Sequence, residues 1–138
     1  MKIKMPPSVN MVIDSLHAKG FEAYAVGGCV RDTILAREPD DWDITTSASP
    51  QQVKEIFDRT VDTGLEHGTV TVLAGSGAHE VTTHRIDGEY EDGRHPKEVV
   101  FTSSLAEDLR RRDFTINAMA YNNEEGLVDL FDGIRDLQ

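Results

Sequence analysis

A pair of glycines between an apolar strand and a short amphipathic helix is the feature that most restricts how this chain can fold. Residues 21–26 form an apolar run that predicts a strand, and Gly27-Gly28 ends it. Residues 29–37 then have the helical spacing of Val30, Ile34 and Leu35. A strand, a glycine turn and a helix in succession indicate a sheet with helices packed on it, an α/β (α+β) fold.

The elements on either side continue this alternation. We expect a helix before the strand, with Ser8 as its N-cap and Gly20 as its end. A later helix is expected with Ser49 as N-cap and Pro50 at its first position, ending at Phe57. Residues 41–46 predict a strand between these two helices.

The second half of the chain changes to period-two alternation. A β-hairpin is predicted from residues 69–74 and 80–85, with Gly75-Ser76-Gly77 in its turn. Residues 86–98 are polar and rich in turn residues, so we expect a mobile loop. Beyond it, Ser104 predicts the cap of a helix running into three arginines, and residues 127–130 predict a short closing strand.

Length and composition exclude several classes of protein. At 138 residues, 38% of them hydrophobic and 28% charged, the chain fits one globular domain. It has no apolar run of the roughly 18 residues that a membrane span needs and no apolar stretch typical of a signal peptide, so we expect a cytoplasmic protein. The single cysteine, Cys29, excludes an intramolecular disulfide and a thiolate zinc site, which leaves oxygen as the main ligand for any metal.

The charge is unfavourable for nucleic acid. With a net charge of −11, this domain alone is not expected to hold RNA by phosphate neutralisation. Its basic residues nevertheless cluster, above all in Arg110-Arg111-Arg112, so a small anionic ligand can be steered to one face. The alternative for such a run is a solvated helix end.

The segment Asp41-Trp42-Asp43 carries the strongest sign of chemistry. In a strand, Asp41 and Asp43 point to the same face about 7 Å apart along the chain. Two carboxylates that repel each other favour a cation between them, and hard oxygen ligands suit Mg²⁺, which also takes phosphate oxygens. The alternative is that the two aspartates form a solvated acidic strand end. For an isolated Asp-x-Asp we weigh the metal site and the solvated strand end about equally.

The glycine turn makes the metal hypothesis stronger. Gly27-Gly28 lies between a strand and a helix, where backbone amides can receive phosphate oxygens, and Arg31 follows one turn later. Alone, such a pair is more often a plain tight turn. A phosphate-binding turn followed by a metal-binding strand is the combination that indicates a nucleotide site.

Three segments of the chain resemble the head-domain motifs of the class II CCA-adding enzymes and bacterial poly(A) polymerases. They are Gly27-Gly28-Cys29-Val30-Arg31-Asp32, then Asp41-Trp42-Asp43-Ile44-Thr45-Thr46 leading into Ser49-Pro50, and Arg111-Arg112-Asp113-Phe114-Thr115-Ile116-Asn117-Ala118. The order and spacing match from about residue 21 to residue 133.

The resemblance implies a polymerase-β-like nucleotidyltransferase head with a short mixed sheet and flanking helices. It makes Asp41 and Asp43 the catalytic metal ligands for two Mg²⁺ ions. It makes six residues nucleotide-binding: Gly27, Gly28 and Arg31 at the triphosphate, and Arg112, Asp113 and Asn117 at phosphate, ribose or base. Asp113 in a structural salt bridge is the alternative for that residue.

Two further roles follow from the same resemblance. Glu80, expected to open the second hairpin strand, is a candidate third metal ligand, with an edge-strand charge as the alternative. Residues 87–97 resemble the family's flexible loop that takes part in switching between bases, with an ordinary solvent loop as the alternative.

The implied activity is template-independent addition of CCA to tRNA 3′ ends from CTP and ATP. Poly(A) addition stays open, because the family's base-selecting motif lies on a neck helix beyond the head, and we expect residues 1–138 to be a head domain cut before neck, body and tail domains. The string Glu107-Asp108-Leu109-Arg110-Arg111 is not that motif, since it precedes the Arg-Arg-Asp segment. A non-catalytic nucleotide- or metal-binding module and a nucleotidyltransferase that modifies protein also stay open.

Overall fold

The computed structural model describes residues 3–39, 41–64, 68–75, 77–87, 99–102, 104–112 and 114–137. The helices are α1 (Pro7–Ala18), α2 (Gly28–Ile34), α3 (Pro50–Ile56), α4 (Leu105–Arg110), the 3₁₀ helix η2 (Thr115–Asn117) and α5 (Gly133–Leu137). The strands are β1 (Ala23–Val26), β2 (Asp43–Thr46), β3 (Thr60–Gly64), β4 (Thr69–Ala74), β5 (Gly77–Thr83), β6 (Arg85–Asp87), β7 (Val99–Phe101), β8 (Met119–Asn122) and β9 (Gly126–Asp129).

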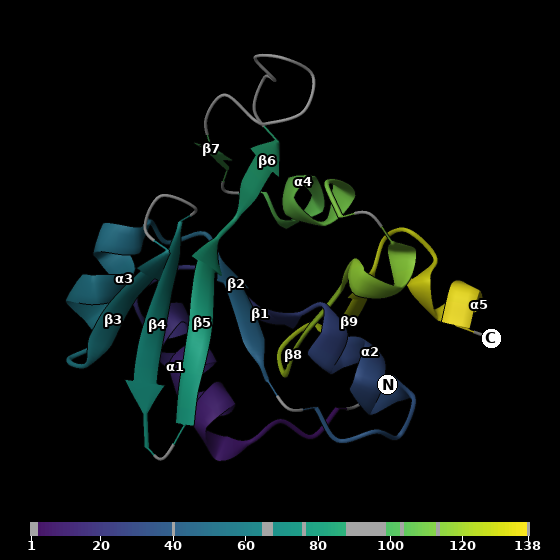
Figure 1. Ribbon diagram of the computed structural model, residues 1–138, viewed down its shortest axis with the longest axis horizontal. Coiled ribbons are helices and arrows are strands. Elements are labelled where there is room, and N and C mark those ends of the chain that lie inside the picture. Colours follow the sequence, from purple (N-terminus) through teal and green to yellow (C-terminus); the bar gives the residue numbers. More distant parts are fainter. Residues whose placement is uncertain are drawn as a thin grey trace.

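Seven of these strands form one mixed sheet in the order β3-β4-β5-β2-β1-β8-β9 (Figure 1). Strands β2 and β5 pair in parallel, and the other neighbours in the sheet are antiparallel. Strands β6 and β7 pair separately as a small antiparallel ribbon beyond the end of β5. The expected α/β fold with a mixed sheet and flanking helices is confirmed.

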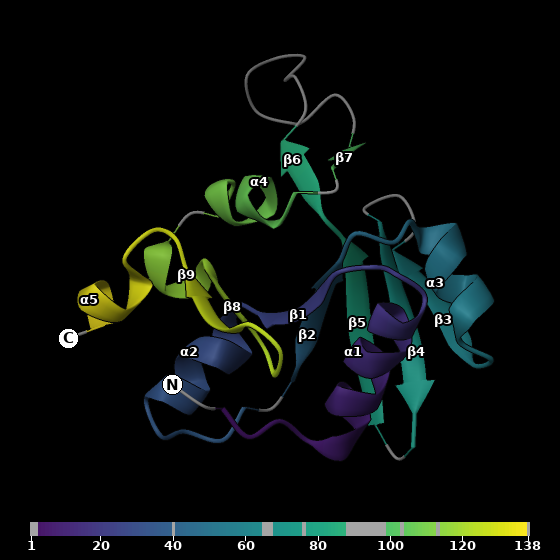
Figure 2. The same ribbon diagram turned by 180° about the vertical axis from the view of Figure 1, so that it is seen from behind.

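Helices cover one face of the sheet at β4 and β5. Helix α1 lies behind these strands in Figure 1 and in front of them when the molecule is seen from behind in Figure 2. Along β4 the side chains of Val70, Val72 and Ala74 are buried toward this side, and the alternate residues are only partly buried. The alternation of apolar and polar residues in the hairpin thus corresponds to one sheet face covered by α1 and one more open face, because successive side chains of a strand point to opposite faces.

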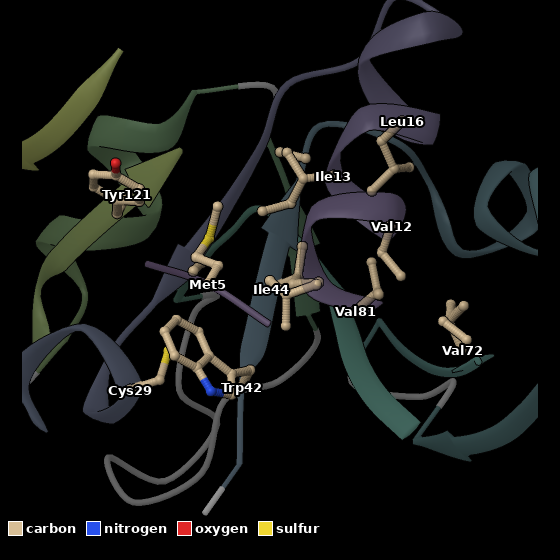
Figure 3. Close-up of a cluster of buried hydrophobic side chains, with 14 of the residues drawn as sticks. Met5, Val12, Ile13, Leu16, Cys29, Trp42, Ile44, Val72, Val81 and Tyr121 are labelled. Atoms are coloured by element: carbon tan, nitrogen blue, oxygen red, sulfur yellow. The ribbon is translucent and has the colours of Figure 1, made fainter. Parts of the chain in front are cut away.

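The core between α1 and the sheet is made of aliphatic side chains. Figure 3 shows Val12, Ile13 and Leu16 of α1 beside Ile44, Val72 and Val81 of the strands. Full burial of each such side chain contributes about 1.5–3 kcal/mol. Trp42 lies at the edge of the same cluster, next to Cys29 and Met5.

The structure confirms two of the three expected helix caps. The Ser49 side chain accepts a hydrogen bond from the Gln52 amide, and the Ser49 amide in turn donates one to the Gln52 side chain, a complete capping box. Ser104 accepts from the Glu107 amide at the start of α4. Ser8 as a cap is wrong: α1 begins at Pro7 with Pro6 as its N-cap residue.

Several element boundaries also differ from expectation. Strand β2 begins at Asp43, so Asp41 precedes the strand; helix α2 includes Gly28 and ends at Ile34. Strand β3 and helix α5 were not predicted. Residues 86 and 87, expected in a loop, belong to β6 because they pair with β7, a partner more than ten residues away; residues 88–98 of that loop lie outside the described residues.

Among the helices described, none combines the length and the apolar character that crossing a bilayer requires.

Candidate functional site

Three carboxylates line one cavity on the open face of the sheet. In the parallel pairing of β2 with β5, Ile44 lies opposite Val81. The preceding residue of each strand, Asp43 in β2 and Glu80 in β5, therefore lies at the same level of the sheet. Asp43 and Glu80 are exposed, while their neighbours Ile44 and Val81 are buried on the covered face. A cavity of about 310 Å³ lies here, lined by Asp41, Trp42, Asp43, Thr71, Ala78 and Glu80. Glu80 is in the middle of β5 rather than at its start.

The carboxylates interact electrostatically. Although Asp43 is partly exposed, the desolvation of its carboxylate by the surrounding protein raises its pKa, and the charges of Glu80 and Asp41 raise it further, while Arg112 lowers it. The ionised form of Asp43 is therefore disfavoured, and Arg112 offsets this effect only in part. The grouping agrees with the same-face expectation for Asp41 and Asp43, although only Asp43 belongs to a strand.

This donor set fits a hard divalent ion. Mg²⁺ takes oxygen ligands and is usually held by one or two carboxylates together with substrate phosphates. Among the described residues, no three acidic, histidine or cysteine side chains are grouped as a complete metal site. Glu80 lines the same cavity as the aspartates, and its role toward metal stays a prediction.

The glycine bend lies directly beside this face. Val26, the last residue of β1, pairs with Asp43, and Gly27 follows it with a φ of 84°, a conformation that favours glycine. A Cβ on Gly27 would lie 3.5 Å from Nη1 of Arg112. The Gly27 amide donates to the Met119 carbonyl at 3.2 Å, so that amide is already used within the fold. Gly27 is needed here for its backbone shape.

Arg31 is held in place by two partners. Its Nη1 donates to Oδ1 of Asn117 at 2.9 Å, and its Nε pairs with Oδ1 of Asp32 at 3.0 Å. A Cβ on Gly28 would lie 3.4 Å from Nη2 of Arg31, so the guanidinium lies over the glycine bend. The contact with Asn117 joins residues 86 positions apart and ties α2 to η2, which pack together.

Arg112 is fixed from the other side by a residue that sequence reasoning missed. Asp108 is 0% exposed, and its Oδ1 pairs with Nη2 of Arg112 at 3.2 Å. Its Oδ2 lies 3.7 Å from Nε of Arg111. The arginine run is therefore no solvated helix end, because two of its members turn back onto a buried carboxylate. The i,i+4 spacing of Asp108 and Arg112 on a predicted helix was the available signal.

Five of the six expected nucleotide-binding residues thus gather at one place. Gly27, Gly28, Arg31, Arg112 and Asn117 surround the bend at the end of β1, next to Asp43. Asp113 lies outside the described residues. An acidic cavity beside a cluster of arginines and a glycine bend can hold a metal ion and the phosphates of a nucleotide together.

The chain is similar to known proteins along nearly its whole length. Residues 23–138 match the family model described as the poly A polymerase head domain. Over 127 residues the chain is 54% identical to the CCA-adding enzyme of Lactobacillus delbrueckii subsp. bulgaricus, a match that covers 92% of this chain and 32% of that protein. The chain therefore spans about a third of the length of the curated relatives it matches.

Solved structures share the fold. The crystal structure of the Bacillus stearothermophilus CCA-adding enzyme in complex with CTP superposes with a TM-score of 0.86 at 42% identity, covering 96% of this chain and 32% of that one. A tRNA nucleotidyltransferase complexed with a primer tRNA and an incoming ATP analog gives a TM-score of 0.67 at 35% identity, covering 92% and 36%.

Proposed function

Because the chain belongs to the poly A polymerase head domain family of nucleotidyltransferases, we propose that it is the catalytic head of an enzyme that adds CCA to tRNA 3′ ends from CTP and ATP. The relatives that support CCA addition are 52–56% identical to this chain and are CCA-adding enzymes. A solved relative was crystallised with CTP, and another with a primer tRNA and an ATP analog.

One observation carries the proposal. Asp41, Asp43 and Glu80 line a single cavity on the open face of the sheet, and the bend at Gly27 lies beside it with Arg112 against it. Acidic groups that lie beside cationic groups suit a ligand in which a divalent cation is bound to phosphate.

We assign the cation site to Asp41 and Asp43, with Glu80 as a further ligand. Mg²⁺ bound there supplies charge neutralisation at the reacting phosphate and makes a hydroxyl easier to deprotonate. The pKa of Asp43 is raised by burial and by its acidic neighbours and is lowered by Arg112, so a further cation beside this carboxylate would be favourable.

The other residues hold the nucleotide. Arg31 and Arg112 lie against the glycine bend and are assigned to the triphosphate, whose negative charge they offset. Asn117, fixed by Arg31, and Asp113 are assigned to ribose or base. Gly27 and Gly28 let the triphosphate approach the backbone because neither has a side chain in the way.

The reaction is a nucleotidyl transfer. The RNA 3′ oxygen forms a bond to the α-phosphorus, the bond to the leaving pyrophosphate breaks, and the hydroxyl proton passes to solvent. The protein mainly positions charge: Asp41 and Asp43 on the side of the attacking oxygen, the arginines on the side of the leaving group.

The acceptor RNA is assigned to parts of the protein outside residues 1–138. This head domain has a net charge of −11, which opposes binding to a polyanion, and the relatives are about three times as long as this chain. Neck, body and tail domains beyond the head would hold tRNA and select the base.

The experiment that tests CCA addition uses the full-length protein and a tRNA lacking its last three nucleotides. With CTP and ATP supplied singly and together, we expect incorporation of C and A that stops after three residues. Long A tracts from ATP alone would instead establish poly(A) addition. Labelling of protein in a mixture of acceptors would establish a nucleotidyltransferase that modifies protein.

Replacing the aspartates tests catalysis itself. The Asp41→Ala/Asp43→Ala variant of the full-length protein should extend tRNA at least about 1,000-fold more slowly, since the cation's contribution amounts to several kcal/mol. Asp14→Asn, on the exposed surface of α1, is the control and should keep the normal rate. An unchanged rate in the double variant would make the domain a non-catalytic binding module.

A further inference from the structure

Ser8 and His79 form a partly buried polar contact that the proposed chemistry does not use. The Ser8 hydroxyl and Nε2 of His79 are 2.8 Å apart, although the residues are 71 positions apart in sequence. His79 is buried, since only 8% of it is exposed. Ser8 lies on α1 and His79 on β5, so the bond ties the covering helix to a central strand of the sheet.

The absence of a side chain at Gly77 leaves space for the contact between Ser8 and His79. Gly77 opens β5, and a Cβ there would lie 3.1 Å from Nε2 of His79 and 3.2 Å from the Ser8 hydroxyl. Any side chain at this position would therefore press on both partners.

The other nitrogen of the ring faces the metal-binding segment. Trp42 and His79 line the same cavity. Nδ1 of His79 is buried and has no hydrogen bond of normal geometry among the described residues. Burial lowers the pKa of His79, and the nearby Trp42 backbone opposes this shift. Since Ser8 holds Nε2, Nδ1 is the atom left for Trp42.

Asp41 and Trp42 need such an anchor. The ladder of β2 begins only at Asp43, so the two residues before it are not held by strand pairing. Side chains alternate across the sheet, so His79 and Trp42 lie on the covered face while Asp43 and Glu80 lie on the open one. If His79 restrains the Trp42 backbone from the covered face, it also fixes the positions of the neighbouring carboxylates of Asp41 and Asp43 on the open face.

We propose that His79, oriented by Ser8, is a positioning residue for the metal-binding aspartates Asp41 and Asp43. The inference rests on the proposed function for its consequence in catalysis. Its structural half, the restraint of Trp42, stands independently. Loss of the Ser8 hydroxyl leaves the ring free to turn and loosens the segment that carries both aspartates.

Trp42 provides a direct measurement, because it is the only tryptophan among the 138 residues. In the 138-residue chain, Ser8→Ala and His79→Phe should raise the acrylamide quenching constant of Trp42 emission about twofold, and Ser8→Thr, which keeps the hydroxyl, should not. The matched control is Thr83→Val, which removes another buried bond from β5, that of the Thr83 hydroxyl to the Ala48 carbonyl at 2.7 Å. An unchanged quenching constant in Ser8→Ala and His79→Phe, or an equal rise in Thr83→Val, overturns the inference.

The catalytic half is measured on the full-length protein as the MgCl₂ concentration for half-maximal CTP incorporation. Ser8→Ala should raise that concentration about 5-fold, the effect of one hydrogen bond, and leave the KM for CTP at saturating MgCl₂ close to normal. Thr83→Val should leave both values unchanged. If quenching rises but the MgCl₂ requirement does not, the positioning role is wrong. A wild-type protein that incorporates no nucleotide at all instead refutes the proposed function.

Discussion

At the scale of single residues, the site depends on how buried charges are paired. Asp108 has no exposed surface and faces two arginines, and Arg112 in turn lies against Gly27 and lowers the pKa of Asp43. The Asp108 carboxylate on α4 thereby fixes the position of the Arg112 guanidinium beside the proposed metal ligands. A guanidinium kept in one place before the nucleotide arrives does not have to be ordered on binding.

Asp108→Asn should weaken both folding and nucleotide binding. Removing one partner of a buried ion pair leaves an uncompensated charge and costs about 3–5 kcal/mol in the free energy of unfolding. Urea unfolding of the chain and the KM for CTP in the full-length protein measure the two effects, and the KM should rise. Glu107→Gln, one residue earlier on the same helix, is the control. A stable Asp108→Asn variant with a normal KM would contradict this role for Asp108.

At the scale of elements, short helices and strand ends are fixed by local hydrogen bonds. Helix α3 spans seven residues and has a complete capping box between Ser49 and Gln52. A helix so short is marginal by itself, because nucleation is costly. Its cap and the burial of Val53 against the sheet are what stabilise it.

Ser49→Ala should lower the free energy of unfolding by about 1 kcal/mol, because the Gln52 amide loses its acceptor. Chemical denaturation of the chain measures this change. Gln51→Ala, exposed on the same turn and outside the capping box, should change stability by less than about 0.5 kcal/mol. Equal effects of the two substitutions would mean that the cap contributes nothing particular.

The junction of β5 and β6 predicts a dependence of stability on pH. His84 is fully buried there, with Nδ1 bonded to the Thr45 hydroxyl at 2.7 Å. Burial lowers the pKa of His84 from 6.5 to about 4; Asp108 opposes this shift and Arg112 adds to it. Between these values the unfolded chain binds a proton that the folded chain does not. The stability is therefore fully present above pH 6.5 and is lost as the pH falls toward 4.

The loss should reach about 3 kcal/mol on acidification from pH 7 to pH 4, since one pKa unit corresponds to about 1.4 kcal/mol. Urea unfolding at several pH values measures it. The His84→Phe variant should show a smaller loss over the same range, because it has no imidazole to protonate. If both proteins lose stability in parallel, His84 is not responsible.

At the scale of the whole molecule, the distribution of charge separates chemistry from RNA binding. The net charge is −11, yet arginines converge on the glycine bend beside the carboxylates. Such a surface attracts a nucleotide bound to a cation at one place and repels a long polyanion elsewhere.

The chain of 138 residues should therefore bind tRNA far more weakly than the full-length protein, and it should add nucleotides poorly or not at all. Gel-shift and fluorescence-anisotropy titrations at about 0.15 M salt compare the two proteins, and extension assays compare their rates. Base-selective CCA addition by the 138-residue chain alone would overturn this prediction and the assignment of RNA binding to other domains.

Local patterns in the sequence determined the elements whose signals need no distant partner. The capped helices at Ser49 and Ser104 and the hairpin of β4 and β5 follow from spacing and turn chemistry, and so does the glycine bend after β1. Alternation in a strand predicted that Asp41 and Asp43 share a face; both line one cavity, although Asp41 precedes β2. Ser8 misled the same rules, since its hydroxyl bonds to a histidine 71 residues away in place of capping α1.

What only the tertiary structure decided are the contacts between segments far apart in the chain. The parallel pairing of β2 with β5 brought Glu80 level with Asp43, and the pairing of β6 with β7 made residues 86 and 87, expected in a loop, part of a strand. Burial made Asp108, one charge on a predicted helix, the partner of Arg112. Strand register and burial depend on the packing energy of the whole sheet, so they cannot be predicted from any short stretch of neighbouring residues.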